Sequence, residues 1–390
     1  MKVAIVEICE PNHYTAVKAL GLTYASDLQN EVSIYTLAHF KTLDTLVNNA
    51  NIQLIKKTEA QTILEFLEQI NDAGFNTIHI NTVSKYYSHF AAVNWKNLVL
   101  TVHNIDIWFN NPLNNQFALL KYRVFNTKGN IKQTFYLPIK YFTKEYFWQK
   151  QRVKMLTKII SQNQKVLVYS EAQKKTLSKY LSAKQVVVFP FCVREVTADL
   201  SVNNKFLRVC IPGSVDNHRR DYDGLFELLK KNHLLFANQI CFDLLGYIPK
   251  TETTIIPQIK ELEKLGIQII YNQNFIDDKE YNERLQLCDV ILGNLQASLN
   301  HQSKYGETKE TGVVFNMIKA AKPGIFPNFY PVEEILKPIC LLYSSDLEQL
   351  LLGLIKDNTQ LHTLKQKAIE ISKFYEPQYL YPKLIKQILN

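Results

Sequence analysis

Two stretches of this 390-residue sequence combine residue types that can hold a phosphate group. In the first, Tyr305–Pro327, a polar segment ends at Thr311, and Gly312 opens a run with the spacing of a helix. Lys322–Gly324 should end this helix, and Ile325–Pro327 should form the next strand. A helix N-terminus presents free N–H groups and a positive dipole end, so the pattern predicts an anion site or, alternatively, an ordinary helix–strand connection. The apolar residues of the expected helix face are Val313, Val314, Met317, Ile318 and Ala321.

The second stretch contains two adjacent arginines. A predicted strand that ends at Ile211 is followed by Gly213 and Ser214, and Arg219 and Arg220 come shortly before the next helix. Arginine presents a planar fork to two phosphate oxygens, which suits a diphosphate. The alternative is a pair of surface arginines in salt bridges with the nearby aspartates. Neither this strand nor the first strand of the chain is followed by a GxGxxG pattern, which argues against NAD.

Two histidines lie where predicted strands end. His103 ends the strand Leu98–His103, and Asn104 follows it. A histidine there can hydrogen-bond a sugar or act as a base, because its ordinary pKa lies near neutrality; a structural hydrogen bond is the alternative. His13 lies in the loop after the first strand, Val3–Ile8. We expect His13 and Asn104 to contact an acceptor, although His13 could also contact a donor.

The elements that would position these residues alternate between strand and helix. This alternation predicts an α/β protein with two doubly wound, Rossmann-like parallel sheets. Ligands of such sheets bind beyond the carboxyl ends of the strands, so we expect a cleft between two domains. The polar stretch Arg194–Lys205 is typical of a linker. The predicted domains are 1–193, with an aromatic, basic insert at 105–160, and 206–365, followed by a helical segment at 366–390. The predicted strands are Val3–Ile8, Val32–Leu37, Ile52–Ile55, Thr77–Val83, Leu98–His103, Val166–Ser170, Val186–Phe191, Leu207–Ile211, Cys241–Leu245, Ile267–Tyr271, Val290–Leu295, Ile325–Pro327 and Ile339–Tyr343.

The composition is that of a globular protein long enough for two domains. Charged residues make up 21% and hydrophobic residues 46% of the sequence, which is typical of a folded chain. The six cysteines form no CxxC pair and no Cys/His cluster, so we expect buried thiols in a reducing cytoplasm. No apolar run approaches the roughly 20 residues that cross a bilayer, and residues 1–8 are typical of a strand, not of a signal peptide.

The net charge of +9 is concentrated in residues 121–158, where Glu145 is the only acid. Aromatic side chains such as Tyr146, Phe147 and Trp148 are interleaved with the basic ones. This combination suits an anionic membrane surface or a nucleic-acid groove, and a solvated helix face with buried aromatics is the alternative. The basic residues are Lys121, Arg123, Lys128, Lys132, Lys140, Lys144, Lys150, Arg152, Lys154 and Lys158.

Taken together, these features resemble the GT-B glycosyltransferases. The resemblance rests on the two Rossmann-like domains, on the sequence PGS…RRDYDGL, and on the late G-x-x-K-x-T-G segment that ends in KPGI. It is greatest to the family-4-like enzymes that use nucleotide sugars to build bacterial surface polysaccharides. The resemblance implies transfer of a sugar from a UDP- or GDP-linked donor to a hydroxyl of a saccharide or lipid-linked acceptor, without a cofactor or a metal. It also implies a cytoplasmic protein, with 121–158 on the inner face of the plasma membrane, and a C-terminal helix at 366–390 that crosses back to the first domain.

The resemblance also implies roles for individual residues. The family spaces two glutamates eight residues apart before the late helix, and Thr308 and Asn316 stand at these positions here. The usual ribose contact and the stereochemical outcome therefore stay open, with Glu307 or Glu310 as substitutes. We expect His103 and Glu310 to be catalytic. The expected diphosphate-binding residues are Gly213, Ser214, Arg219, Arg220, Lys309, Thr311 and Gly312. The expected nucleoside- and ribose-binding residues are Gly246, Tyr247, Phe275 and Asn316.

Three other functions remain as alternatives. A non-catalytic protein that binds nucleotide sugars or glycans on a GT-B scaffold would explain the missing glutamate pair. A non-hydrolysing nucleotide-sugar epimerase would share the fold, but it would require more carboxylates and histidines in the N-terminal domain than we find. A nucleic-acid-binding protein is supported by the charge of 121–158 alone, and we therefore predict no nucleic-acid partner.

Overall fold

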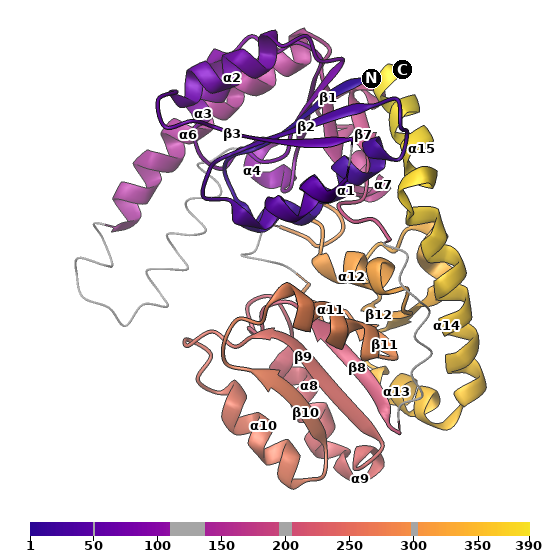
Figure 1. Cartoon of the computed structure of the whole chain (residues 1–390). Coiled ribbons are helices and arrows are strands. Elements are labelled where there is room, and N and C mark those ends of the chain that lie inside the picture. The colour runs from indigo at the N-terminus through magenta and orange to yellow at the C-terminus, as the bar shows by residue number, and fades with distance from the viewer. Residues whose placement is uncertain (50, 110–136, 195–204, 298–302) are drawn as a thin grey trace. The chain divides into compact units, whose positions relative to one another are not determined.

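The computed structural model describes residues 1–49, 51–109, 137–194, 205–297 and 303–390 (Figure 1). Residue contacts group the chain into two compact units. The first unit contains Met1–Val193, Asn300–Glu310 and Pro377–Asn390, and the second contains Arg194–Leu299 and Thr311–Glu376. Residues 303–310 fall within the predicted second domain, but their contacts group them with the first unit.

The first unit is built on a seven-stranded sheet in the order β3-β2-β1-β4-β5-β6-β7, in which every pairing is parallel. Helices cover both faces, with α2, α3 and α6 on one and α1 and α15 on the other (Figure 1). The strands are β1 (Lys2–Glu7), β2 (Glu31–Thr36), β3 (Ile52–Lys56), β4 (Thr77–Ile80), β5 (Leu98–Thr101), β6 (Lys165–Val168) and β7 (Val186–Val188). The helices are α1 (Tyr14–Ala25), α2 (Ile63–Asp72), α3 (Tyr87–Ala92), α4 (Ile105–Phe109), α6 (Leu137–Ser161), α7 (Glu171–Leu177) and α15 (Pro377–Leu389).

The second unit is built on a six-stranded parallel sheet in the order β10-β9-β8-β11-β12-β13. One face packs against α8, α10, α13 and α14, and the other carries α11 and α12. The strands are β8 (Leu207–Pro212), β9 (Ile240–Tyr247), β10 (Gln268–Asn272), β11 (Val290–Leu292), β12 (Gly324–Pro327) and β13 (Cys340–Tyr343). The helices are α8 (Tyr222–Lys231), α9 (His233–Phe236), α10 (Ile255–Lys264), α11 (Asp278–Leu287), α12 (Gly312–Ala320), α13 (Leu347–Lys356) and α14 (Asn358–Ser372).

The predicted fold class is confirmed, and most differences concern the ends of elements. Strands predicted to reach His103 and Val83 end at Thr101 and Ile80, because the residues beyond them turn into the loops at the sheet edge. Helix α2 begins at Ile63, where Thr62 and Glu65 form a capping box. The helical segment predicted at 366–390 contains the end of α14 and all of α15.

The insert predicted at 105–160 contains α4 and most of α6, and residues 110–136 lie outside the described part of the chain. The second half of α6 packs Met155, Leu156 and Ile159 into the core of the first unit. Arg152 is also buried, with its guanidinium carbon 5.3 Å from the centre of the Tyr87 ring. This part of α6 is therefore an integral element of the first unit.

A buried ion-pair network stabilises the second sheet on the face that carries α11 and α12. Asp243 on β9 is fully buried, and Arg208 Nη2 on β8 lies 2.6 Å from its Oδ2. Arg284 on α11 pairs with Oδ1 of the same carboxylate and also with Glu280, at 3.1 Å. Two guanidinium groups thus satisfy one buried carboxylate, which is the condition under which a buried charge is tolerated.

Candidate functional site

In the first sheet the strand order reverses between β1 and β4, and ligands of doubly wound sheets bind at such a point, beyond the carboxyl ends of the strands. The loops after β1, β4 and β5 bring together the two predicted residues His13 and His103. Thr82, which was not predicted, lies between them. The imidazole rings of His13 and His103 stack with their centres 4.4 Å apart. Thr82 Oγ1 lies 2.8 Å from His13 Nδ1 and 3.1 Å from His103 Nε2.

Both ring nitrogens of His103 have protein partners. Nε2 lies 2.6 Å from the main-chain oxygen of Asn81, and because a carbonyl only accepts, this nitrogen carries the proton. Nδ1 lies 2.7 Å from the hydroxyl of Tyr169, which therefore donates to it. Desolvation of the ring lowers the pKa of His103 to about 3, which keeps it neutral. This arrangement favours the structural interpretation of His103, and its predicted catalytic role stays a prediction.

His13 differs from His103 because one of its nitrogens is open. Nδ1 contacts Thr82, whereas Nε2 makes no hydrogen bond to any residue that the structure describes. The His13 side chain is half-buried, so Nε2 is not fully enclosed by the first unit. Desolvation lowers the pKa of His13, and nearby Lys309 lowers it further, while Glu10 opposes the change.

The loop that carries His13 is held by a buried carboxylate that the sequence analysis did not single out. Glu7, at the end of β1, accepts hydrogen bonds from the backbone N–H groups of Cys9 and Glu10, each at 2.9 Å. Its second oxygen accepts from the side-chain amide of Asn81 at 2.6 Å. Burial raises the pKa of Glu7, and hydrogen bonds that include one from the Thr82 hydroxyl oppose this.

The late polar segment contributes Lys309 to this same group of loops. Lys309 forms an antiparallel bridge with Asn104, and the backbone N–H of Ile105 donates to the carbonyl of Thr308 at 2.8 Å. The side-chain amide of Asn104 also donates to Ser303 Oγ at 3.1 Å. Lys309 thus lies close enough to both histidines to lower their pKa values. Asn104, which was predicted to contact the acceptor, thus connects the late polar segment to the loop after β5.

In the second unit, the loop after β8 is shaped by two glycines. Gly213 has φ +100°, and a Cβ atom there would lie 2.7 Å from Arg220 Nη2. A Cβ atom on Gly246, at the end of β9, would lie 2.2 Å from the carbonyl oxygen of Gly213. Only glycine allows these two backbones to approach so closely. The two predicted glycines therefore lie against each other at the carboxyl edge of the second sheet.

The two adjacent arginines have different surroundings. Arg220 is buried, and its guanidinium donates to the carbonyl of Pro212, so it supports the loop from within. The side chain of Arg219 is 53% exposed and pairs only weakly with Asp216, at 4.0 Å. Ser214 is partly exposed, and its hydroxyl makes no hydrogen bond within the described residues. Arg219 and Ser214 are therefore the accessible polar groups of this loop.

Two predicted nucleoside-binding residues come together at the next loops. The rings of Tyr247, at the end of β9, and Phe275, after β10, have centres 6.5 Å apart. Both are exposed, Phe275 to 81% and Tyr247 to 42%. Large aromatic side chains that remain in solvent at the edge of a parallel sheet are suited to stacking against a planar ring.

The predicted helix start of the late segment is confirmed. Helix α12 begins at Gly312, and Thr311 Oγ1 accepts a hydrogen bond from the N–H of Val313 at 3.3 Å. Gly312 is exposed, and a Cβ atom there would meet nothing within 4 Å. Asn316 donates its side-chain amide to the carbonyl of Gly312, and Glu310 is buried. Glu310, the predicted substitute for a family glutamate, is therefore shielded from solvent. Gly312 forms the exposed start of α12.

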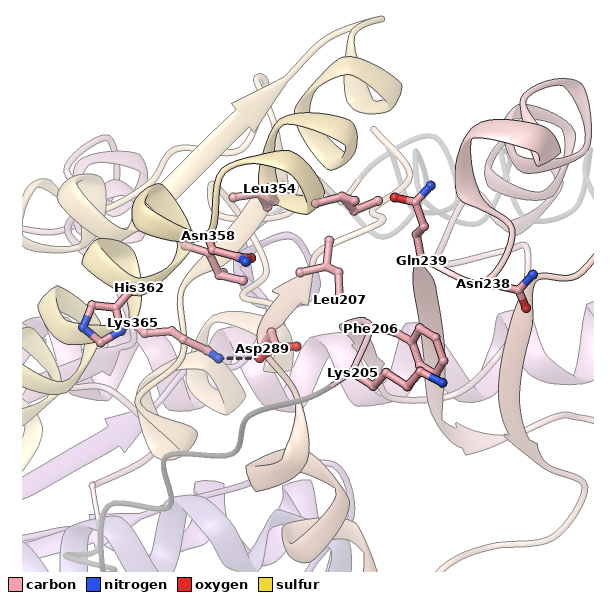
Figure 2. A pocket seen from close by; sticks show the side chains of 12 residues that line it. Lys205, Phe206, Leu207, Asn238, Gln239, Asp289, Leu354, Asn358, His362 and Lys365 are labelled. Atoms are coloured by element: carbon pink, nitrogen blue, oxygen red, sulfur yellow. Dashed lines mark hydrogen bonds and ion pairs between the residues drawn. The ribbon is translucent and has the colours of Figure 1, made fainter.

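None of the predicted site residues lines the cavity in Figure 2, which has a volume of about 480 Å³. It lies at the opposite, amino end of the second sheet, where Leu207 begins β8 and Asp289 precedes β11. The ion pair between Lys365 and Asp289 crosses it. No group of His, Cys, Asp or Glu in the described parts of the chain could hold a metal ion.

Comparison with known proteins identifies the fold. No protein-family model and no curated protein matches the sequence. Among solved structures, HepE from Anabaena in complex with UDP matches with a TM-score of 0.62 at 12% sequence identity, over 100% of both chains. The protein has the GT-B fold. A glycosyltransferase from Rickettsia africae matches with a TM-score of 0.59 at 14% identity, over 100% of this chain and 98% of its own. WaaG, a glycosyltransferase involved in lipopolysaccharide biosynthesis, matches with a TM-score of 0.54 at 10% identity, over 100% and 99% of the two chains.

Sequence reasoning missed Glu7, Thr82 and Tyr169. All three residues were assigned to predicted strands, and no motif surrounds Glu7 in the strand Val3–Ile8. A signal was available in one case, because a carboxylate in the apolar run of a central strand must be hydrogen-bonded if it is buried. Thr82 and Tyr169 became recognisable only when the ends of the strands were known.

Proposed function

We propose that this protein transfers a sugar from a UDP- or GDP-linked donor to a hydroxyl of a saccharide or lipid-linked acceptor, in the synthesis of a cell-surface polysaccharide. The observation that carries the proposal is the edge of the second sheet, where the glycine-shaped loop with Arg219 lies next to the exposed pair Tyr247 and Phe275. Further support comes from the fold, because HepE binds UDP and UDP-glucose, and WaaG and the Rickettsia protein are glycosyltransferases.

In this proposal the second unit holds the donor. Arg219, Ser214 and the N–H groups at the start of α12 bind the diphosphate, with Arg220 and the two glycines shaping the loop. Tyr247 and Phe275 stack against the base, and Asn316 lies near the ribose. Cations and helix N–H groups stabilise the negative charge that develops on the leaving diphosphate, so the proposal requires neither a metal nor a cofactor.

The first unit supplies the acceptor side. His13, Asn104 and His103 lie at the carboxyl edge of its sheet, with Lys309 beside them. The acceptor hydroxyl attacks the anomeric carbon of the sugar, and the nucleoside diphosphate leaves. Exclusion of water from the site favours transfer over hydrolysis.

A thermal-shift series with UDP, GDP, ADP and NAD tests nucleotide binding. We expect stabilisation by UDP or GDP and none by NAD. No stabilisation by any nucleotide, together with retention on DNA, would contradict the proposal and favour a nucleic-acid-binding protein.

Replacing Arg219 by alanine is expected to weaken UDP or GDP binding by roughly 10-fold to 100-fold, since a hydrogen bond to a charged group contributes about 1.5–3 kcal/mol. The melting temperature should change little, because the side chain is half exposed. The matched control is Lys231→Ala, which removes an exposed cation from the far end of α8. Titration calorimetry that gives the same nucleotide affinity for Arg219→Ala as for the wild type would remove Arg219 from the site.

We also propose that the exposed face of α6 binds an anionic membrane surface. Phe147 is 64% exposed on it, and Tyr146, Val153 and Ile160 are exposed as well. Lys150 and Lys154 are interspersed among them. A helix face that combines aromatic, aliphatic and basic side chains is suited to the interface of an anionic bilayer. None of the helices in the described residues is long and apolar enough to span a membrane.

The double variant Lys150→Glu, Lys154→Glu is expected to reduce binding to phosphatidylserine vesicles at least about tenfold, because each basic side chain near such a surface contributes about 1 kcal/mol. Vesicle co-sedimentation is the measurement. The control variant Lys175→Glu, Lys179→Glu makes the same change of charge at exposed positions elsewhere in the first unit. Equal retention of the two variants would exclude α6 as the membrane-binding face.

A further inference from the structure

The cavity in Figure 2 lies at the end of the second sheet that is opposite to the proposed donor loop. It is lined by residues that lead into β8, β9 and β11, which are neighbours in the sheet. Strand β8 runs from Leu207, at the cavity, to Pro212, and at a rise of about 3.3 Å per residue its two ends are roughly 17 Å apart. A small molecule in this cavity would therefore be separate from one bound at Arg219.

One side of the cavity is a polar face of α14. Asn358, His362 and Lys365 follow one another at intervals of four and three residues, so they lie on the same face of the helix, and all three line the cavity. Figure 2 shows His362 and Lys365 beside each other. Asn358 and His362 are exposed, and neither side chain makes a hydrogen bond to a residue that the structure describes. This face of α14 therefore presents an amide and an imidazole with unused hydrogen-bonding capacity.

Lys365 also keeps donor capacity, although it forms an ion pair. Its ammonium contacts Oδ1 of Asp289, and the other carboxylate oxygen accepts from the backbone N–H of Arg208 at 2.9 Å. The Asp289 side chain is only 4% exposed, so its charge is matched within the protein. An ammonium group has three hydrogens, and the Lys365 side chain is still 25% exposed. The hydrogens that Asp289 does not use are therefore available to a ligand.

The other side of the cavity supplies a second cation. Lys205 is exposed, and within the described parts of the chain its ammonium has no hydrogen bond and no ion pair. Its Nζ lies 5.3 Å from the centre of the Phe206 ring. The side-chain amides of Asn238 and Gln239 lie on this side as well (Figure 2). Amide groups both donate and accept hydrogen bonds, which is what the hydroxyl groups of a sugar require.

We propose that this cavity is a second small-molecule site and that it binds a sugar phosphate. Its volume of about 480 Å³ falls within the range of small-molecule sites, about 300–1,000 Å³. Asp289 is the only acid among the described lining residues, and because Lys365 matches it, the surplus charge is positive. A phosphate group accepts strong hydrogen bonds from ammonium groups, and the amides around it bind the hydroxyls. A free sugar would leave Lys205 without a counter-charge, and inorganic phosphate would leave most of the cavity empty.

Titration calorimetry with fructose 6-phosphate tests the site, and it should give a dissociation constant below about 1 mM. Fructose, inorganic phosphate and AMP should each bind at least about tenfold more weakly. Lys205→Ala should weaken fructose 6-phosphate binding at least about tenfold, as expected for the loss of a charge-assisted hydrogen bond. The matched control is Lys260→Ala, which removes an exposed lysine of α10 outside the cavity and should leave the affinity unchanged. His362→Ala is a second test, because its side chain is exposed and its loss should not disturb the fold.

An absence of fructose 6-phosphate binding, or wild-type affinity in both Lys205→Ala and His362→Ala, would overturn the inference. Tighter binding of AMP than of fructose 6-phosphate would overturn the assignment to a sugar phosphate.

The proposed donor site provides an independent check. Saturating UDP should leave the affinity for fructose 6-phosphate unchanged, and so should Arg219→Ala, because the two sites lie at opposite ends of the sheet. Loss of fructose 6-phosphate binding in the presence of UDP would place the phosphate in the donor loop and overturn the inference. A protein that binds fructose 6-phosphate but neither UDP nor GDP would contradict the proposed function and leave the cavity site standing.

Discussion

Replacing Asp243 by alanine is expected to lower the free energy of unfolding of the second unit by about 3–5 kcal/mol, the range for breaking a buried ion pair. The carboxylate is fully buried, and its removal leaves the guanidinium groups of Arg208 and Arg284 without their counter-charge. The loss is larger than for a surface pair because neither arginine can recover its hydration inside the unit.

The measurement for Asp243→Ala is urea unfolding followed by two signals. All three tryptophans, Trp95, Trp108 and Trp148, lie in the first unit, so their fluorescence reports on that unit, whereas far-ultraviolet circular dichroism reports on both. The circular-dichroism transition should move to lower urea, with a smaller change in the fluorescence transition. Glu280→Ala, which removes the half-exposed partner of Arg284, is the control and should cost less than about 1 kcal/mol. Equal stability of the two variants would contradict the assigned role of Asp243.

Replacing Gly246 by valine is expected to abolish measurable UDP or GDP binding and to lower the free energy of unfolding by about 1–3 kcal/mol, as for other overpacked sites. The clash is with backbone atoms, because the new Cβ would lie 2.2 Å from the oxygen of Gly213 and 2.6 Å from its carbonyl carbon. No rotamer can relieve it, so the loop after β8, which carries Ser214 and Arg219, must move.

Titration calorimetry and a thermal melt check this prediction. Gly353→Ala is the matched control: its Cβ meets no atom within 4 Å, and it lies inside α13, so it should gain up to about 1 kcal/mol of stability and keep full nucleotide affinity. Wild-type nucleotide affinity in Gly246→Val would show that the close approach of the two glycines does not shape the donor site.

The sequence predicted the fold well because strand and helix periods are local properties. The late segment is the clearest case: Thr311 caps the helix, Gly312 begins it, and Gly324–Pro327 forms the strand that follows. The segment's surroundings were not predictable in the same way. Within the first unit, Lys309 forms a short antiparallel bridge with Asn104 and lies near His13 and His103, and its role in binding a diphosphate stays a prediction.

The site was predictable only in part, since hydrogen-bond partners come from distant parts of the chain. His103 has the motif of a catalytic histidine, but Tyr169 and Asn81 occupy both its nitrogens. The sequence predicts both Arg219 and Arg220 as diphosphate-binding residues and does not distinguish between them. The structure does, because Arg220 is buried whereas the side chain of Arg219 is half exposed. Tyr247 and Phe275 were expected separately, and the adjacent strands β9 and β10 bring them together.

The central claim is that the protein uses a nucleotide sugar as a glycosyl donor. The most direct measurement is the release of nucleoside diphosphate from a panel of UDP- and GDP-linked sugars, with and without an added saccharide acceptor. The protein should release UDP or GDP from one of these donors, faster with the acceptor present, and the Arg219→Ala variant should release it more slowly at limiting donor concentrations. Tight binding of UDP or GDP without turnover of any donor would contradict the claim and identify the protein as a nucleotide-sugar-binding protein on a GT-B scaffold.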